Sequence, residues 1–252
     1  NQIGLLKPSA TLAINEESNR LKKIGKKVFK FGFGQSPFEV PNDIVNELKN
    51  NAFQNKYLPM QGLKKLREVI AKYTSDKKGY NYNPENVIIG PGSKELMFLL
   101  HVLFEGDIIL PAPSWVSYAP QAVLGRNKIQ TIQTSKENNW FPTAEEIEKV
   151  ILKDENKNYL LFLNSPNNPS GQVCKNIEEI SQITKKYNLI ILSDEIYSEL
   201  SFVNNYKSIS NFCPENPMFS IDNTIISLKS LFRLDLIETP SPAHFCISLV
   251  TA

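Results

Sequence analysis

Histidine and cysteine are scarce in this sequence of 252 residues, and their scarcity excludes several kinds of site. The only histidines are His101 and His244, which excludes a histidine-rich metal centre, and His101 lies in an apolar segment typical of a packed helix. The cysteines are far apart and form no CxxC pattern: Cys174, Cys213 and Cys246. Such an odd, scattered set indicates reduced thiols in an intracellular compartment rather than a disulfide framework or a zinc site. We therefore expect no metal in the functional site.

Long apolar runs and a charge imbalance are missing as well. No apolar stretch approaches the ~20 residues that span a membrane, and 28 basic residues against 26 acidic ones give a formal net charge of +2. Neither a membrane nor nucleic acid is therefore expected as a partner. The densest basic run, residues 20–27, is interleaved with Leu21 and Ile24, which indicates the solvated face of an amphipathic helix. We expect a cytoplasmic location, with an organelle as the alternative because the chain begins at Asn1 rather than methionine.

Short apolar runs alternate along the chain with segments of helical periodicity. The apolar runs predict strands at 86–90, 107–111, 129–133, 159–164, 189–194 and 224–228. The helical patterns lie at 41–53, 63–74, 93–104, 143–154 and 176–187. This alternation predicts an α/β fold of three layers, with a largely parallel sheet covered by helices on both faces. In such a fold ligands bind at the carboxyl ends of the strands, so the residues that follow each strand are the candidates for function.

Two of these loops carry candidate phosphate-binding and ring-binding groups. After the strand at 86–90, the residues "PGSKEL" place Ser93 and Lys94 at the start of a helix, where a phosphate could bind. The alternative is a glycine turn in which Ser93 is only the N-cap. After the strand at 107–111, Trp115 could stack on a planar ring, or it could simply anchor its loop.

Two further loops carry amide, carboxylate and phenol groups. The connection "SPNNPSGQV" is rich in residues with special backbone preferences, and it places Asn168 to offer its amide to a ligand, while Asn164 and Asn167 are expected to satisfy local backbone groups. Asp194 ends an apolar strand, where a carboxylate is costly unless it meets a cation, and Tyr197 follows it. The alternative for Asp194 is a helix N-cap followed by an exposed Glu195.

Together, these groups suit one cofactor. A phosphate seat, a stacking tryptophan, an amide, a carboxylate for a protonated ring nitrogen and a phenol match the needs of pyridoxal 5'-phosphate. The carboxylate keeps the pyridine nitrogen protonated, so that the ring can withdraw electrons from a carbanion. The cofactor also needs a lysine that forms a Schiff base, and Lys229, after the strand at 224–228, is the candidate.

Six motifs in register give the chain a family resemblance. The segments, in order, are "KPSATLAINEESNRLKKIGKKV", "GQSPFEVP", "KYLPMQGLKKLREVIAKY", "LPAPSWVSYAP", "LNSPNNPSG" and "LSDEIYSEL". With them the chain resembles the class I pyridoxal-phosphate-dependent aminotransferases, and most of all the bacterial-type aspartate aminotransferases. The resemblance extends from residue 7 to about residue 228. It implies the large-domain fold of that family.

The resemblance assigns a role to each candidate residue. It implies that Ser93, Lys94, Trp115, Asn168, Asp194, Tyr197 and Tyr57 bind the cofactor, and that Gly34, Trp115 and Asn168 contribute to the substrate site. Ser93 and Lys94 are implied at the phosphate end, and Trp115 is implied to stack on the ring. Asn168 and Tyr197 are implied to hydrogen-bond the phenolic oxygen of the ring, while Asp194 pairs with its nitrogen. Tyr57 is implied to reach the cofactor phosphate of a partner subunit, which predicts a homodimer. In the segment that holds Gly34, Ser36 and Glu39 depart from the family pattern, which affects specificity.

The end of the chain departs from the family pattern. The family has its lysine in a Ser-x-Ser-Lys segment, followed by a glycine-containing stretch and an arginine that binds the phosphate, whereas here Lys229 follows "SL" and Arg233 comes too early. The interval from Asp194 to Lys229, 229 − 194 = 35 residues, is compatible with the family. We predict an N-terminal segment (1–35), a cofactor-binding large domain (36–228) and a divergent tail (229–252) in place of the small C-terminal domain, that is, a truncated chain.

The predicted function is that of a transaminase. The resemblance implies transfer of an amino group between an amino acid, expected to be aspartate-like, and a 2-oxo acid by means of pyridoxal phosphate. The alternatives are a pyridoxal-phosphate lyase of the same fold and a truncated, non-catalytic remnant that binds a partner.

Overall fold

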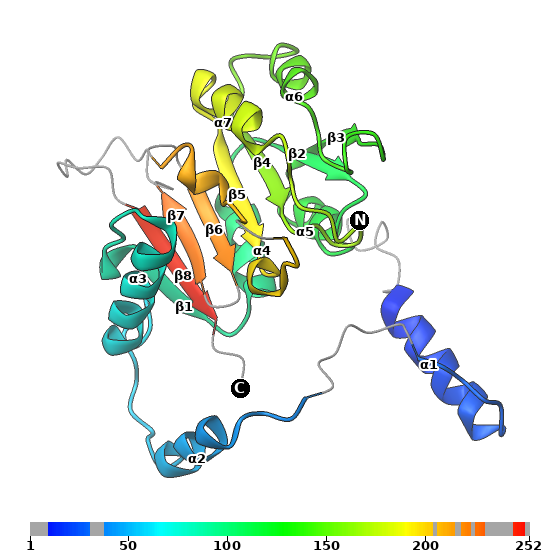
Figure 1. The fold of residues 1–252 in the computed structure, drawn as a ribbon, viewed down its shortest axis with the longest axis vertical. Helices are drawn as coiled ribbons and strands as arrows, with labels where there is room; N and C mark the ends of the chain where they lie inside the picture. The colour runs from blue at the N-terminus through cyan, green and yellow to red at the C-terminus, as the bar shows by residue number, and fades with distance from the viewer. Residues whose placement is uncertain are drawn as a thin grey trace. The chain divides into compact units, whose positions relative to one another are not determined.

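The computed structural model describes residues 10–30, 38–203, 206–214, 218–222, 225–229 and 244–249. The chain divides into two compact units, residues 1–58 and residues 59–252. The first unit contains α1 (Ala10–Lys23) and α2 (Asn42–Asn51), which are labelled in Figure 1. The amphipathic helix expected over the basic run is therefore present, but it begins well before that run and ends at Lys23. The predicted divisions after residues 35 and 228 stay predictions.

The described strands of the second unit form one sheet. Its strands are β1 (Val87–Gly90), β2 (Asp107–Ala112), β3 (Lys128–Gln133), β4 (Tyr159–Asn164), β5 (Ile190–Glu195), β6 (Met218–Asp222), β7 (Ile225–Lys229) and β8 (His244–Leu249). They lie in the order β1-β8-β7-β6-β5-β4-β2-β3. The strands from β3 to β6 in that order are parallel to one another, and β1 is parallel to β8. Among the described strands, β7 alone runs against its neighbours β6 and β8.

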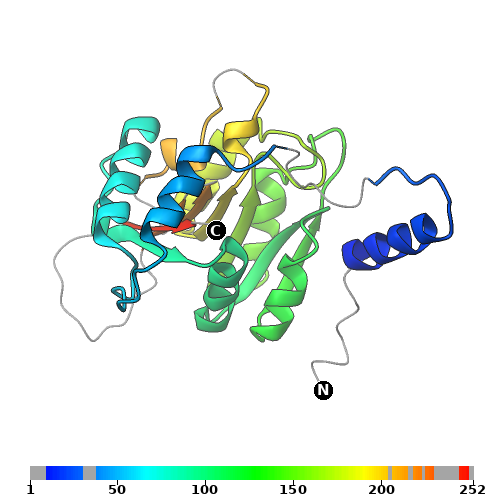
Figure 2. The same cartoon turned by 90° about the horizontal axis from the view of Figure 1, so that it is seen from below.

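Helices cover both faces of this sheet. They are α3 (Lys64–Lys78), α4 (Ser93–Leu103), α5 (Tyr118–Leu124), α6 (Ala144–Ile151) and α7 (Ile177–Lys186). The described residues also form 3-10 turns at η2 (Pro84–Asn86), η3 (Ser198–Leu200) and η4 (Ile209–Asn211). The helices α4 and α5 lie on one side of the sheet (Figure 2), where Leu96, Leu100 and Tyr118 pack against Phe162 and Leu192. On the other face α6 and α7 pack through Ile147 and Ile180 against strand residues that include Leu161 and Ile191. The predicted three-layer, largely parallel α/β fold is confirmed.

The central strands are apolar because both of their faces are covered. All six residues of β4 are buried, which is why its sequence "YLLFLN" is a continuous apolar run rather than an alternating one.

Local sequence signals fix the ends of the helices. Thr143 and Glu146 form a capping box at the start of α6, and Gly79 ends α3 in the left-handed conformation with φ of 68°.

The structure differs from the sequence-based expectations in four elements. The helix α5 was not expected, and neither were the strands β6 and β8. The strand expected at 224–228 is present as β7, but its antiparallel direction differs from the parallel arrangement of the strands before it. A strand that follows its neighbour after only the two residues between Asp222 and Ile225 must reverse direction, because a parallel connection needs a dozen or more residues.

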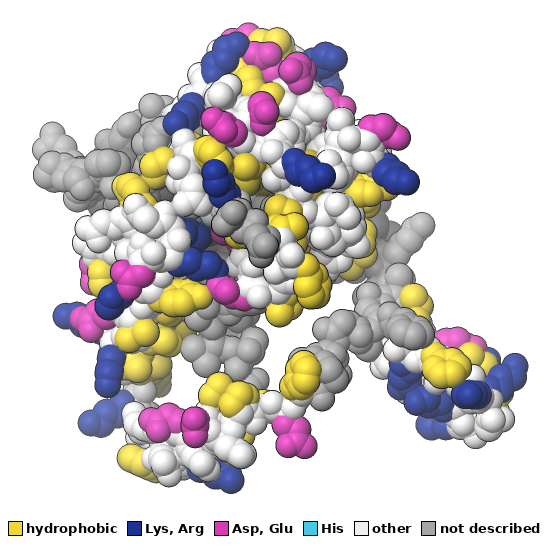
Figure 3. Space-filling view, viewed as in Figure 1, with side chains coloured by type: hydrophobic (Ala, Val, Ile, Leu, Met, Phe, Trp, Pro, Cys, Tyr) yellow, Lys and Arg dark blue, Asp and Glu magenta, His cyan; other side chains and the backbone are white. Residues whose placement is uncertain are grey.

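The surface is mixed in charge. On the face of the molecule seen in Figure 3, lysine and arginine side chains are interspersed with aspartate and glutamate. In the part of the chain that the structure describes, no helix is both long enough and apolar enough to cross a membrane.

Candidate functional site

The candidate site lies at the carboxyl ends of β2, β4 and β5. Trp115 follows β2, Asn168 follows β4, Asp194 is the fifth residue of β5 and Tyr197 comes just after that strand. Because β2, β4 and β5 are parallel neighbours, these ends meet at one edge of the sheet. Asn164 of β4 pairs in register with Asp194 of β5, which fixes the relation between the two loops.

Asp194 is the buried acid at this edge, with 4% of its surface exposed. Its Oδ2 accepts a hydrogen bond from the hydroxyl of Tyr118, and its Oδ1 accepts one from the backbone N–H of Ile196 at 3.2 Å. Burial raises the pKa of Asp194 to about 6, although both hydrogen bonds act in the opposite direction. The alternative in which an exposed Glu195 follows a capping Asp194 is wrong, because Glu195 is itself buried and no α-helix begins here.

Asn168 and Tyr197 come together from separate loops. Asn168 Nδ2 donates to the hydroxyl oxygen of Tyr197 at 3.3 Å, so an amide and a phenol lie side by side. Asn164 links this pair to the acid, since its Oδ1 accepts from the backbone N–H of Asn168 at 2.7 Å and its Nδ2 donates to the backbone carbonyl of Asp194 at 2.9 Å. The expected local role of Asn167 is also confirmed, because its Oδ1 accepts from the backbone N–H of Ser170 at 3.1 Å.

Lys94 and Trp115 form the opposite side of the site. The Nζ of Lys94 lies 5.5 Å from the centre of the Trp115 ring, within the range of a cation–π contact. Ser93 is the first residue of α4, and the residue that caps this helix is Gly92, so the N-cap role considered for Ser93 does not hold. The packing before α4 is tight at Gly90, the last residue of β1, because a Cβ at that position would lie 2.7 Å from the side chain of Leu96.

Tyr118 is the residue that the sequence reasoning missed. Its ring meets Trp115 edge-on, with centroids 5.4 Å apart, and its hydroxyl binds Asp194, so it joins the two sides of the site. Burial and the neighbouring carboxylate of Asp194 raise the pKa of Tyr118, which keeps the phenol protonated and able to donate. The position of Tyr118 three residues after Trp115 could have indicated that both residues belong to the site. It was missed because Tyr118 begins the short helix α5, which was not expected.

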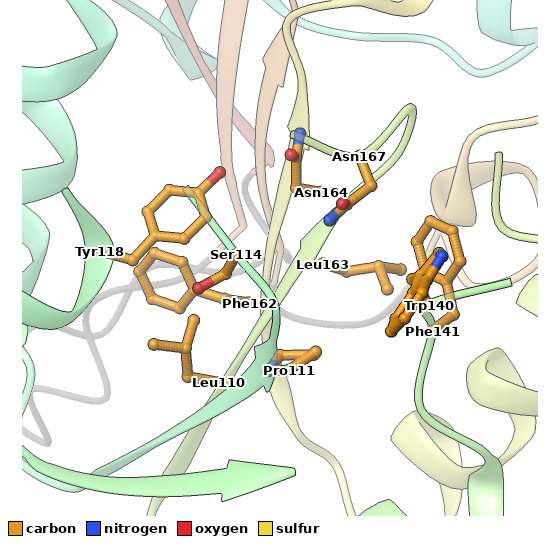
Figure 4. A pocket seen from close by; sticks show the side chains of 10 residues that line it. All are labelled: Leu110, Pro111, Ser114, Tyr118, Trp140, Phe141, Phe162, Leu163, Asn164 and Asn167. Atoms are coloured by element: carbon orange, nitrogen blue, oxygen red, sulfur yellow. The ribbon is translucent and has the colours of Figure 1, made fainter. Parts of the chain in front are cut away.

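A small pocket opens beside this network. Ten residues line it: Leu110, Pro111, Ser114, Tyr118, Trp140, Phe141, Phe162, Leu163, Asn164 and Asn167. In Figure 4, Tyr118 and Phe162 lie on one side, Trp140 and Phe141 on the other, and the amides of Asn164 and Asn167 between them. Trp140 has a φ of 64° and follows Asn139 with a φ of 53°, so two successive residues other than glycine adopt the left-handed conformation at this pocket.

Three further predicted site residues belong to the first unit, lie outside the described residues or are described only in their backbone. Tyr57 belongs to the first unit and is fully exposed. Gly34 lies within 31–37, outside the described residues. Lys229 is the last residue of β7, whose backbone is described. Leu228 pairs with Phe219 of β6, which in turn pairs with Leu192 of β5. Because β7 is antiparallel to β6, Lys229 lies one position further toward the beginning of β5.

The position of Lys229 has a consequence for its predicted role. Asp194 lies three residues closer to the carboxyl end of β5 than the position that Lys229 faces, which corresponds to roughly 10 Å along the strand. The antiparallel direction of β7 thus carries the backbone of Lys229 away from the carboxyl edge. Its role as the Schiff-base lysine stays a prediction, and this strand direction does not favour it.

Comparisons with known proteins give the family. The family model described as "Aminotransferase class I and II" matches residues 26–226. The chain belongs to this aminotransferase family. Among curated relatives, it is 34% identical over 210 residues to an aspartate aminotransferase of Bacillus sp. (strain YM-2), a match that covers 80% of this chain and 53% of the relative. It is 32% identical to an aspartate aminotransferase of Geobacillus stearothermophilus, with 85% of this chain and 56% of the relative covered.

Solved structures of aminotransferases have the same fold. The aspartate aminotransferase of Thermus thermophilus with maleate superimposes with a TM-score of 0.79 at 26% identity, covering 88% of this chain and 59% of that one. The match to the aspartate aminotransferase of Thermotoga maritima has a TM-score of 0.80 at 28% identity, and it covers 88% of this chain and 60% of that one. This aminotransferase chain therefore spans little more than half the length of the relatives that it matches.

The buried Asp194 of this aminotransferase chain should make its stability depend on pH. Since the pKa of Asp194 is about 6 in the fold and the ordinary value is 3.8, the folded chain binds this proton more tightly than the unfolded chain does. The stabilisation is complete below the ordinary value and is lost as the pH rises through the folded value. A shift of about two units corresponds to about 3 kcal/mol of unfolding free energy, most of it lost between about pH 4 and about pH 6.

Urea denaturation of the parent and of Asp194→Asn across this range measures the effect. The difference in unfolding free energy, parent minus variant, should fall with rising pH, because asparagine does not titrate. Burial also lowers the pKa of His101 to about 4, but both chains share this group and its contribution cancels. A difference that stays constant with pH would show that Asp194 is ionised in the fold as easily as in water.

Proposed function

We propose that this chain is part of a pyridoxal-phosphate-dependent aminotransferase, which moves an amino group between an amino acid, aspartate-like, and a 2-oxo acid. Family membership supports this proposal, and so do the relatives that bear the name aspartate aminotransferase. The observation that carries it is the contact network from Lys94 through Trp115, Tyr118 and Asp194 to the Asn168–Tyr197 pair.

The residues at this edge fit the cofactor. Asp194 is buried, and the hydrogen-bond partners of its carboxylate in the described part of the chain are Tyr118 and Ile196, neither of which is a cation. A buried carboxylate without a cation is costly, and the protonated ring nitrogen of pyridoxal phosphate would supply one. Trp115, with Lys94 over its ring, suits the face of the cofactor ring, and Ser93 at the start of α4 suits the phosphate end.

Each side chain then has one task. When bound, pyridoxal phosphate supplies a ring that withdraws electrons from the carbon whose proton is removed. Asp194 would hold the proton on the ring nitrogen, and Tyr118 fixes the direction of that carboxylate. Asn168 and Tyr197 would bind the phenolic oxygen of the ring, and Trp115 would shield the ring from water. Gly34 is proposed to bind the substrate carboxylate.

We further propose a homodimer. Tyr57 is fully exposed in the first unit, and the family resemblance assigns it to the cofactor phosphate of a second subunit. A hydroxyl supplied in this way would complete each site only in the pair.

One observation favours a second function. The direction of β7 places the backbone of Lys229 away from the carboxyl edge of the sheet. This arrangement suits a remnant that binds the cofactor but lacks a lysine of its own to bond it covalently. Such a chain would bind pyridoxal phosphate but would turn over no substrate.

Product analysis tests the transaminase proposal. Incubation of the chain with pyridoxal phosphate, aspartate and 2-oxoglutarate should yield glutamate and oxaloacetate in equal amounts. The matched variant Asp194→Asn should bind the cofactor more weakly and should lose the reaction, because a neutral amide cannot hold the proton on the ring nitrogen. Release of ammonia or pyruvate without glutamate would mean a lyase, and no product from a chain that binds the cofactor would mean the remnant.

Borohydride reduction of the complex with pyridoxal phosphate, followed by peptide mapping, tests Lys229. If Lys229 is the covalent residue, the label should be confined to its peptide and should disappear in Lys229→Arg. The control Lys94→Arg changes the lysine over Trp115 and should keep the label on Lys229. A label scattered over exposed lysines, or one that persists in Lys229→Arg, would contradict the assignment.

A further inference from the structure

A buried ion pair lies under the site on the opposite face of β5. Successive side chains of a strand point to opposite faces, so Asp194 meets Tyr118 on the side of α5 while the next residue, Glu195, points to the side of α3. There Glu195 Oε2 lies 3.1 Å from Nζ of Lys78, the last residue of α3, and the two side chains are 1% and 4% exposed.

The pair is held from several directions. Glu195 Oε1 accepts hydrogen bonds from the hydroxyls of Ser193 at 2.7 Å and Ser208 at 2.5 Å. The backbone carbonyl of Lys78 accepts a hydrogen bond from Asn211 Nδ2 at 2.9 Å. The acid, the base and the segment around η4 thus form one polar cluster beneath the end of β5.

A second ion pair from the neighbouring lysine continues this contact. Lys77 pairs with Glu199, whose Oε1 also accepts from the hydroxyl of Tyr73 at 2.8 Å. The hydrogen bond from Lys77, followed by that from Tyr73, holds the pKa of Glu199 below its ordinary value. Two successive lysines at the end of α3 therefore hold two glutamates that lie on either side of Tyr197 in the sequence.

We propose that Lys77, Lys78, Glu195 and Glu199, here termed the α3 clamp, are positioning residues that fix Asp194 and Tyr197 in the cofactor site. Burying a pair of charges seldom adds net stability compared with apolar residues of the same size, so stability is a weak reason for the Lys78–Glu195 pair. Its geometric effect is direct, because the two glutamates of the clamp alternate along the chain with the site residues Asp194 and Tyr197. A cofactor site needs its groups held within about 0.5 Å, and the free ends of strands and loops do not provide this by themselves.

The proposal rests on the proposed cofactor function, and its test separates the two. The variants are Lys78→Met, Glu195→Gln and the double variant, with Arg67→Met as the matched control. Arg67 is a buried cation of the same helix, but it donates to the backbone carbonyl of Pro84 at 2.9 Å and so ties α3 to η2. Hydrogen exchange of the segment 193–199, the dissociation constant of pyridoxal phosphate and the unfolding free energy are measured for each chain.

The single variants should raise exchange in the segment 193–199 and should weaken cofactor binding by about tenfold, as loss of the outer partners of metal ligands does at other sites. The double variant should recover much of the unfolding free energy, because it removes both buried charges together. It should bind the cofactor no more tightly than the single variants, because the contact between α3 and β5 is still missing. Arg67→Met should lose stability and yet keep both the exchange of this segment and the dissociation constant within about twofold of the parent.

Two results would overturn the proposal: unchanged exchange and affinity in a folded Lys78→Met, or the same losses in Arg67→Met. If Lys78→Met does not fold, Glu195→Gln decides, since it removes the charge without changing the shape of the side chain. If the parent does not bind pyridoxal phosphate, the proposed function fails, and the exchange of the segment 193–199 alone decides whether the clamp positions Asp194 and Tyr197.

Discussion

The hydrogen bond between Tyr118 and Asp194 connects the fold of this chain to its chemistry. A carboxylate at the end of the buried strand β5 is costly, and the phenol of α5 partly offsets this cost without neutralising the charge. The sheet must be parallel for Asn164 to come beside Asp194 and for the loops after β2, β4 and β5 to meet. The helix α5 must in turn pack against Phe162 for Tyr118 to reach across, with ring centroids 5.1 Å apart. The site is therefore a consequence of the way in which this face of the sheet is covered.

Most of the fold could be predicted from the sequence because its central strands are apolar on both faces. The runs at 159–164 and 189–194 predict buried parallel strands, and the structure has β4 and β5 at these positions. The helix α5 could not be predicted, since it has only seven residues and contains Pro120. The antiparallel direction of β7 could not be predicted either, because an apolar run indicates that a strand is buried but not in which direction it runs.

The candidate site was predictable in its parts and less so in its connections. The residue types at Trp115, Asn168, Asp194 and Tyr197 indicated a pyridoxal phosphate cage, and the structure brings Asn168 and Tyr197 into contact. The burial of Glu195 was not predictable, because its partner Lys78 is more than a hundred positions away in the sequence. Sequence patterns describe local structure, whereas such pairs depend on the way in which distant helices are placed on the sheet.

We infer that, with pyridoxal phosphate bound, Asp194 would keep the pyridine nitrogen protonated at the carboxyl edge of β5. The most direct measurement is the ¹⁵N chemical shift of the ring nitrogen of labelled pyridoxal phosphate bound to the chain at about pH 8. We expect the shift of a protonated ring in the parent and a change toward the unprotonated value in Asp194→Asn. An unprotonated ring nitrogen in a parent chain that binds the cofactor would contradict this inference.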